Sequence, residues 1–156
     1  LLDMGLDPFS FSDALIGVLS QRLARRLCKH CKTPVEDSAV QIESMAHEYC
    51  KGTTLQPEAV LAQWQQRYAS AEGGAPVIYS APGCDKCNHT GHKGRVGIYE
   101  LMTATPAIKK LIQARSPVEQ LFHCAVGDGM LTLKQYGFIK VLEGLTDQVS
   151  VRSACA

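Results

Sequence analysis

Four cysteines occur as two pairs with C-x-x-C spacing, Cys28 with Cys31 and Cys84 with Cys87. One tight turn across this spacing directs two thiolates at a single tetrahedral metal ion, so two pairs complete the shell of one zinc ion. Four thiolates leave no coordination position for water, so such a metal stabilises the fold and does not act as a Lewis acid. The pattern therefore predicts one structural zinc ion held by Cys28, Cys31, Cys84 and Cys87.

The long separation of the two pairs leaves other hypotheses open. Residues 32–83 lie between them, which is longer than the roughly 15 to 20 residues of a compact zinc ribbon. The alternatives are an iron–sulfur cluster, a redox dithiol, or no metal, although no thioredoxin-like β-α-β pattern surrounds either pair. His30, His89 and His92 could also replace a cysteine as ligand. We expect these histidines to lie exposed in loops.

The remaining residues add no recognisable catalytic chemistry. The chain contains none of the motifs G-x-x-x-x-G-K-[ST], G-x-G-x-x-G, G-x-S-x-G or H-E-x-x-H. The other cysteines, Cys50, Cys124 and Cys155, make a total of seven, an odd number that argues against a disulfide framework, and we expect ordinary thiols there. Arg95 could face a phosphate or form a surface salt bridge, and we favour the surface role.

Composition indicates a globular cytoplasmic protein. The 156 residues are 46% hydrophobic and 20% charged, enough for one domain with a small additional module. No stretch approaches the roughly 18 apolar residues of a membrane span, and the chain begins without an initiator Met or a leader, so we expect a soluble fragment. A net charge of +1 gives no overall field that attracts nucleic acid. The basic residues that do cluster are Arg22, Arg25, Arg26, Lys29 and Lys32; they could form a solvated helix face or a local contact surface for nucleic acid.

The segment before the first pair predicts a helix. Apolar residues recur every fourth position from Phe11 to Leu27, and Ser10 with Asp13 resembles a capping pair, so we predict a helix over 11–27 that runs directly into Cys28.

The segment between the pairs predicts an insertion. Apolar spacing indicates two short amphipathic helices, one with its apolar positions over 40–49 and one with its apolar positions over 60–68, and Pro57 suits the first turn of the second. Residues 70–76 are small and Gly-rich, and 77–79 predicts a short strand. The cysteine pairs would hold together the two ends of this inserted segment where it leaves the main domain. We call the segment between the pairs the excursion.

The C-terminal part predicts one strand and a helical cap. Apolar alternation over 95–101 indicates a core strand. Predicted helices follow at 106–115, opened by Thr105-Pro106, and at 117–126, opened by a capping box of Ser116 and Glu119. A third begins near Thr132 or Gln135 and ends at Gly144, and a fourth begins at Thr146 or Asp147.

Three runs of sequence together resemble the type II secretion and type IV pilus assembly ATPases. They are residues 3–9 (DMGLDPF), 17–31 with the first cysteine pair, and 84–101 with the second. The helical tail, with Gly129-Met130 and the run 141–146, is also similar to the end of that family. Residues 35–80 match no motif of the family, and 149–156 lack its acidic pattern.

This resemblance implies an α+β, mostly helical fold that is the C-terminal part of a RecA-like P-loop NTPase domain. It places the end of the RecA-like core at 1–27, an inserted tetracysteine zinc module at 28–94, a core strand at 95–101 and a C-terminal helical subdomain at 102–156. Cys28, Cys31, Cys84 and Cys87 match the zinc cysteines of the family one for one.

The resemblance also implies a function for the longer parent protein. Family members are homo-hexamers that hydrolyse ATP with magnesium at the cytoplasmic face of the inner membrane and act on platform proteins of the secretion or pilus machine. The phosphate-binding loop would precede Leu1, so this fragment alone is expected not to be an enzyme. The alternative is an independent zinc module that binds protein or nucleic acid. Near-neutral charge and few aromatic residues disfavour nucleic acid as a partner.

Overall fold

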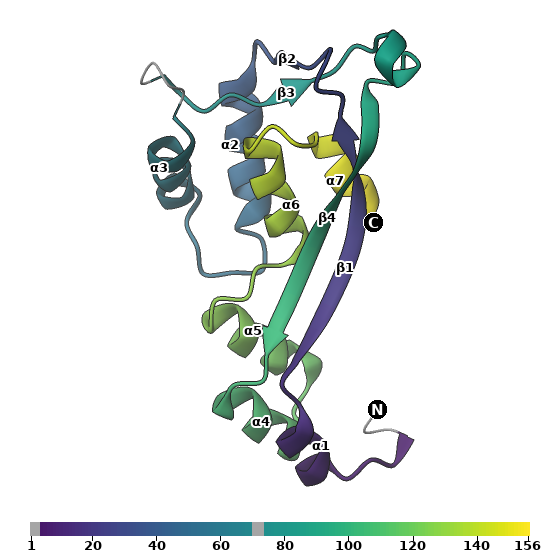
Figure 1. The fold of residues 1–156 in the computed structure, drawn as a ribbon. Helices are drawn as coiled ribbons and strands as arrows, with labels where there is room; N and C mark the ends of the chain where they lie inside the picture. The colour runs from purple at the N-terminus through teal and green to yellow at the C-terminus, as the bar shows by residue number, and fades with distance from the viewer. Residues whose placement is uncertain (1–3, 70–73) are drawn as a thin grey trace. The chain divides into compact units, whose positions relative to one another are not determined.

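The computed structural model describes residues 4–69 and 74–156, which form a mixed α+β fold (Figure 1). This confirms the predicted α+β class. In chain order the elements are α1 (Pro8–Ala14), β1 (Gly17–Leu27), β2 (Thr33–Pro34), α2 (Ser38–Tyr49), α3 (Pro57–Tyr68), β3 (Tyr79–Ser80), the 3₁₀ turn η2 (Asp85–Cys87), β4 (His92–Thr103), α4 (Pro106–Gln113), α5 (Val118–Gly127), α6 (Leu133–Leu142) and α7 (Gln148–Ala154).

The described residues divide into two compact units. The first unit contains the residues up to Ser20 together with Glu100–Thr132, and the second contains Gln21–Tyr99 and Leu133–Ala156. β1 and β4 pair with each other, and each strand contributes residues to both units. Backbone bonds from Ala104 N–H to the Ile16 carbonyl and from Cys28 N–H to the Gly91 carbonyl, both 2.9 Å, make the pairing antiparallel. The boundaries implied by the family resemblance remain a prediction.

The predicted helix over 11–27 is wrong for most of its length. Only α1 is helical there, and β1 follows as a strand. The error has a physical cause, because residues four apart share a helix face but also share a strand face, where side chains alternate with period two. The predicted capping pair is also wrong, since the Asp7 carboxylate caps α1 by accepting from the Ser10 N–H at 2.8 Å.

Pairing with β4 explains why the strand is preferred. Gly17 lies so close to β4 that a Cβ there would be 2.9 Å from the Met102 carbonyl oxygen. This close backbone approach favours glycine at the start of the strand. A long-range partner of this kind overrides local helix propensity and is not visible in the local pattern.

The first unit has a small core. Ile108, Ile112 and Ala125 are buried at its centre, with Phe11 and Leu15 packed against them. α1 and α4 are also joined by a 2.9 Å hydrogen bond from the Gln113 amide to the Ser12 hydroxyl. The unit therefore combines apolar packing with a polar link between its helices.

The two predicted helices between the cysteine pairs are confirmed as α2 and α3, and Pro57 is the first residue of α3. Tyr49 and Trp64 join them edge to face, with ring centroids 5.2 Å apart. The predicted strand at 77–79 overlaps β3 only at Tyr79, which pairs antiparallel with Pro34 of β2. Residues 70–73 of the predicted linker lie outside the described residues.

α6 and α7 pack against each other in the second unit, and α2 packs on α6. A Cβ on Gly137 of α6 would collide with Val151 of α7, so glycine sets how closely these helices approach. Glu48 of α2 binds Lys134 and Arg152, each at 2.9 Å. Burial alone would raise the pKa of the Glu48 carboxyl, but these two cations outweigh it and lower the pKa below its usual value.

The predicted strand over 95–101 is confirmed within the longer β4, and the C-terminal helices are confirmed, with one error at a helix start. Thr105 caps α4 and Asp147 caps α7, as expected. Ser116 does not cap α5, which begins after Pro117 without a side-chain cap. Instead the Ser116 N–H donates to the Leu111 carbonyl at 2.9 Å and belongs to the end of α4.

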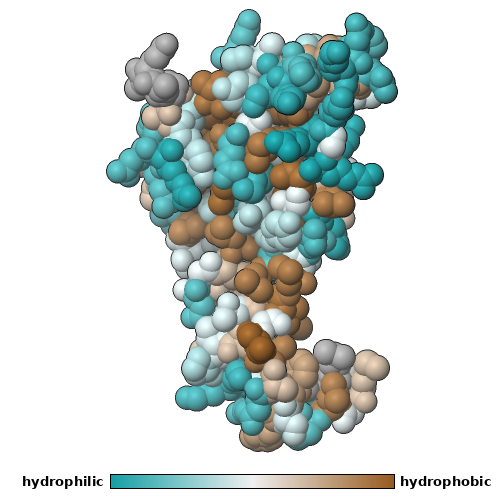
Figure 2. All heavy atoms as spheres, viewed as in Figure 1, coloured by the Kyte–Doolittle hydropathy of each residue, from teal (hydrophilic) through white to brown (hydrophobic). Residues whose placement is uncertain are grey.

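Among residues 4–69 and 74–156, no helix has the length and apolar character that crossing a bilayer requires. The longest helices, α2 and α3, have 12 residues each. Figure 2 shows a mainly hydrophilic surface over η2 and the start of β4.

Candidate metal centre

Two backbone turns position the four predicted cysteines. Cys28 directly follows β1, and the N–H of Lys32 returns to the Cys28 carbonyl at 3.0 Å, which closes the first turn around Cys31. Cys84 precedes η2 and Cys87 ends it, with a 3.0 Å bond from the Cys87 N–H to the Cys84 carbonyl. We call these turns the first and second knuckle, residues 28–32 and 84–91.

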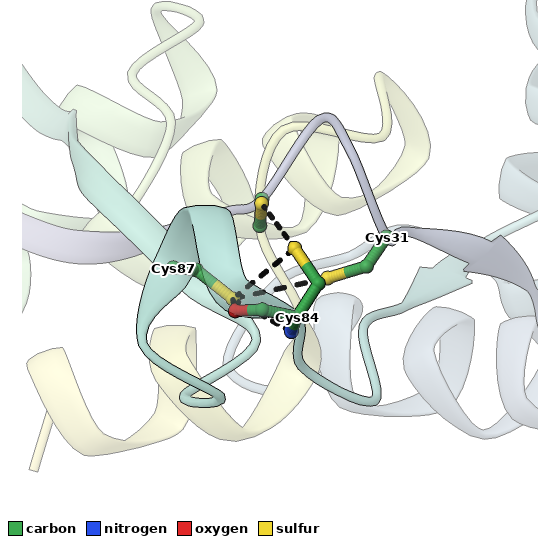
Figure 3. A group of neighbouring side chains, drawn as sticks. Cys31, Cys84 and Cys87 are labelled. Atoms are coloured by element: carbon green, nitrogen blue, oxygen red, sulfur yellow. Dashed lines mark hydrogen bonds between the residues drawn. The ribbon is translucent and has the colours of Figure 1, made fainter.

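The structure brings all four predicted ligands together. Their Sγ atoms lie within 4.8 Å of one another, and the sulfurs of Cys31, Cys84 and Cys87 converge in Figure 3. The Sγ atoms are 3.9 Å apart between Cys28 and Cys84, 3.9 Å between Cys31 and Cys87, and 3.8 Å between Cys84 and Cys87. A tetrahedral zinc ion with bonds of about 2.3 Å requires sulfur–sulfur edges of about 3.8 Å. The donor set and its spacing therefore fit zinc.

Burial and hydrogen bonds give the thiols different acidities. Cys28 and Cys87 are buried, and Cys31 and Cys84 are half-buried. Burial, reinforced by the neighbouring thiols, raises the pKa of Cys31 to about 12. Burial also opposes ionisation of Cys87, but hydrogen bonds from backbone groups of Cys84 and Gly91 outweigh it and lower the pKa to about 6. Cys87 is thus the first of these two to form a thiolate, the state that binds metal.

Two glycines allow the second knuckle to fold tightly. Gly83 and Gly91 both have positive φ angles, +108° and +74°, which L side chains rarely adopt. A Cβ on Gly83 would lie 2.5 Å from the His89 carbonyl oxygen, and one on Gly91 would collide with the Ala81 carbonyl. These positions fix the turn that presents Cys84 and Cys87.

No histidine joins the metal-ligand group found in the described part of the chain. His30 and His89 are exposed, as predicted, and His89 pairs with Asp85 at 3.0 Å. The prediction for His92 is wrong. It is half-buried, and its Nε2 lies 2.5 Å from the Asp147 carboxylate, while its Nδ1 lies 3.0 Å from the Thr90 carbonyl.

The loop between α6 and α7, residues 143–147, supports the knuckles. The Leu27 N–H donates to the Leu145 carbonyl at 2.9 Å, and the Thr146 hydroxyl donates to the Arg25 carbonyl at 2.7 Å. Lys32 donates to the carbonyl of Gly144 at 2.9 Å. Neither these contacts nor the His92–Asp147 pair carries a local sequence signal, because the partners lie far apart along the chain.

The predicted basic cluster does not lie on a helix, because its arginines belong to β1. Strand alternation places Arg22 and Arg26 on one face and Arg25 on the other. Lys32 is half-buried and its ammonium lies 4.6 Å from the centre of the Tyr79 ring. Arg95 is exposed on β4.

The cysteines outside the predicted pairs are Cys50, Cys124 and Cys155. None of them forms a disulfide; Cys50 is buried and the other two are half-buried.

Comparison with known proteins shows which family this chain resembles. The family model described as type II/IV secretion system protein matches residues 1–153. The type IV pilus assembly ATPase PilB of Thermus thermophilus is 34% identical over 92% of this chain and 14% of its own length. The type IV pilus assembly ATPase TfpB of Acinetobacter baylyi is 35% identical over 94% of this chain and 21% of its own length. The type II secretion system ATPase E of Vibrio cholerae is 33% identical over 94% of this chain and 24% of its own length.

The chain thus spans less than a quarter of the length of each of these relatives, and each relative aligns with more than nine tenths of the chain. The match includes both knuckles and the helices around them. The chain therefore belongs to the type II/IV secretion system protein family.

Proposed function

We propose that this chain is the C-terminal part of a cytoplasmic ATPase that powers type II protein secretion or type IV pilus assembly, and that its four clustered cysteines hold one structural zinc ion. The observation that carries the metal assignment is the convergence of four Sγ atoms within 4.8 Å of one another, with three of their separations at 3.8 to 3.9 Å. The names of the relatives support the role in secretion or pilus assembly.

The proposed zinc is structural because four sulfur ligands close its shell. Its place in the chain supports the same role. The two cysteines that it would link, Cys28 and Cys84, are 56 positions apart, and a backbone bond from Cys28 to Gly91 fastens the knuckles beside it. The ion would close the neck of the excursion that contains α2 and α3, and so fix the surface that this excursion offers to other subunits or to the machine.

ATP hydrolysis would belong to the parent protein. The chain has no phosphate-binding motif, so ATP and magnesium would bind in the part of the parent that precedes it. In that protein, 1–27 and 95–101 would complete a RecA-like core, and 102–156 would form its helical subdomain. We propose homo-hexamerisation and peripheral attachment to inner-membrane platform proteins for the parent. An independent zinc module is less well supported, because the family match runs over 1–153 and is not confined to the knuckles.

Metal content tests the proposed centre. Protein purified without added metal is analysed for zinc and iron by elemental analysis, with native mass spectrometry and a free-thiol count. We expect about one zinc per chain, lost in Cys28→Ser and Cys84→Ser and retained in the control Cys124→Ser. Iron in place of zinc, or four reactive thiols without metal, would contradict the assignment.

The motor assignment needs a different readout. The parent protein is assayed for ATP hydrolysis and for hexamers by analytical ultracentrifugation. We expect magnesium-dependent hydrolysis in the parent and none in this chain. A parent that neither hydrolyses ATP nor assembles would contradict the motor assignment without affecting the metal assignment.

A further inference from the structure

A basic groove lies beside the first knuckle. Its volume is about 440 Å³, and it is lined by Arg26 from β1, Leu27, Lys29 and His30 from the first knuckle, and Lys93 from β4. Leu27 is buried, while the four basic side chains are exposed. No carboxylate lines the groove. Lys93 was no member of the basic cluster seen in the sequence, and the antiparallel pairing of β1 with β4 brings it to the groove.

The charge of this groove is not balanced within the described residues. Arg26, Lys29 and Lys93 take part in none of the ion pairs formed there, whereas Lys134, Lys140 and Arg152 all bind carboxylates. The chain as a whole carries only +1. Three cations that form no ion pair among the described residues lie around one concave surface and repel one another, and an anionic partner would relieve that repulsion.

We infer that this groove binds an acidic segment of a partner protein. Flexible lysine and arginine side chains around a concave surface suit several carboxylates carried on an extended chain. A lipid surface fits less well, because none of the exposed large apolar residues lies in either knuckle or in the groove, so nothing there would insert into a bilayer. A compact phosphate is often held in a nest of backbone N–H groups, whereas this groove offers basic residues from β1, the first knuckle and β4 that are all exposed.

The inference builds on the proposed function, in which the zinc ion would hold the first knuckle against the strand that carries Lys93. The backbone bond from Cys28 to Gly91 joins the two knuckles without the ion, so the groove and the metal can be tested separately. A second role for the cations is to balance the charge of four thiolates around a divalent ion. If that were their role, charge reversal in the groove would lower zinc retention and leave peptide binding unchanged. Zinc content is therefore measured on every sample used below.

The test uses the 156-residue chain and a fluorescein-labelled hexaglutamate peptide, followed by fluorescence anisotropy at 50 mM salt. The groove variant combines Arg26→Glu with Lys93→Glu. The matched control combines Lys51→Glu with Lys110→Glu, which makes the same change of charge at exposed sites outside the groove. We expect the groove variant to weaken binding about tenfold or more and the control to weaken it less than about twofold. Raising salt to 500 mM should weaken wild-type binding about tenfold, since exposed charges are screened.

Several outcomes would overturn the inference. One is a zinc-loaded chain that does not bind hexaglutamate, which leaves the metal assignment intact. Others are equal losses in the groove and control variants, or lowered zinc without a change in peptide binding. Binding to phosphatidylglycerol vesicles or to pyrophosphate without binding to hexaglutamate would assign the groove to a lipid surface or to a small anion. A chain without zinc that still binds the peptide through the groove would support the inference and refute the metal assignment.

Discussion

Replacing Cys84 with serine should destabilise the second unit and leave the first unit folded. The substitution removes one of four sulfur ligands, and a zinc site that needs all four loses most of its affinity. The second unit then loses the cross-link between Cys28 and Cys84, 56 positions apart. The first unit has its own core around Ile108 and Ile112 and contains none of the four ligands.

The size of the effect follows from the length of the closed loop. The loop-closure relation used for covalent cross-links gives about 4 kcal/mol for this separation. That is a large share of the roughly 5 to 15 kcal/mol that stabilises a typical domain. With an m value of about 1.5 kcal/mol/M in urea, the unfolding midpoint of the second unit should fall by about 2 to 3 M.

Hydrogen exchange measured by mass spectrometry locates the effect. In Cys84→Ser, and in wild type treated with a chelator, amides of residues 28–91 should exchange faster, while those of α4 and α5 should keep their protection. Cys124→Ser, in the first unit, serves as the control and should leave the second unit unchanged. A native exchange pattern throughout Cys84→Ser would refute the argument that the metal closes the excursion. Equal loss of protection in both units would refute the separation into two units.

Three smaller perturbations test the packing of the second unit, and Gly127→Ala in the first unit is the control for the first of them. Gly137→Ala should cost about 1 to 3 kcal/mol, because its methyl group meets Val151. Gly127→Ala, which meets no neighbour within 4 Å in α5, should be stabilising by up to about 1 kcal/mol; urea unfolding of both variants checks this. Because the pKa of Glu48 is lowered in the folded state, its contribution is complete above about pH 4.5 and is lost as pH falls through the folded-state pKa. Glu48→Gln should therefore flatten the decline of thermal stability between pH 5 and pH 3, and an unchanged slope would contradict this. Lys32→Met should cost about 1 kcal/mol through its lost hydrogen bond, with faster exchange in 143–147, and native exchange there would argue against this support.

The metal ligands could be predicted because their chemistry is local. A C-x-x-C pair predicts two metal ligands within one turn. Two such pairs form a complete four-ligand site wherever the fold brings them together. The helices α2 to α7 were predictable for a similar reason, since their apolar spacing, Pro57 and the caps Thr105 and Asp147 act within a few residues.

Features that depend on distant partners could not be predicted. The four-residue spacing before Cys28 fits both a helix and a strand face, and only the pairing with β4 decides between them. The pairing of His92 with Asp147 and the entry of Lys93 into the groove likewise depend on how the chain folds back. Ser116 shows the opposite problem, because a locally convincing capping box is superseded by the end of the preceding helix.

The fastening of the two knuckles also bears on how this family can change over evolution. Cys28 meets Gly91 through a backbone bond and meets Cys84 at the sulfur cluster, so the ends of the excursion are fixed independently of what lies between them. Doubling the length of a flexible segment costs only about 0.6 kcal/mol in closure entropy. Insertions and deletions between α2 and α3, where a Cβ added to Gly52 would meet nothing within 4 Å, can therefore accumulate without shifting the register of β1 against β4. Natural variants of this protein should differ in length there while keeping the spacing within each knuckle.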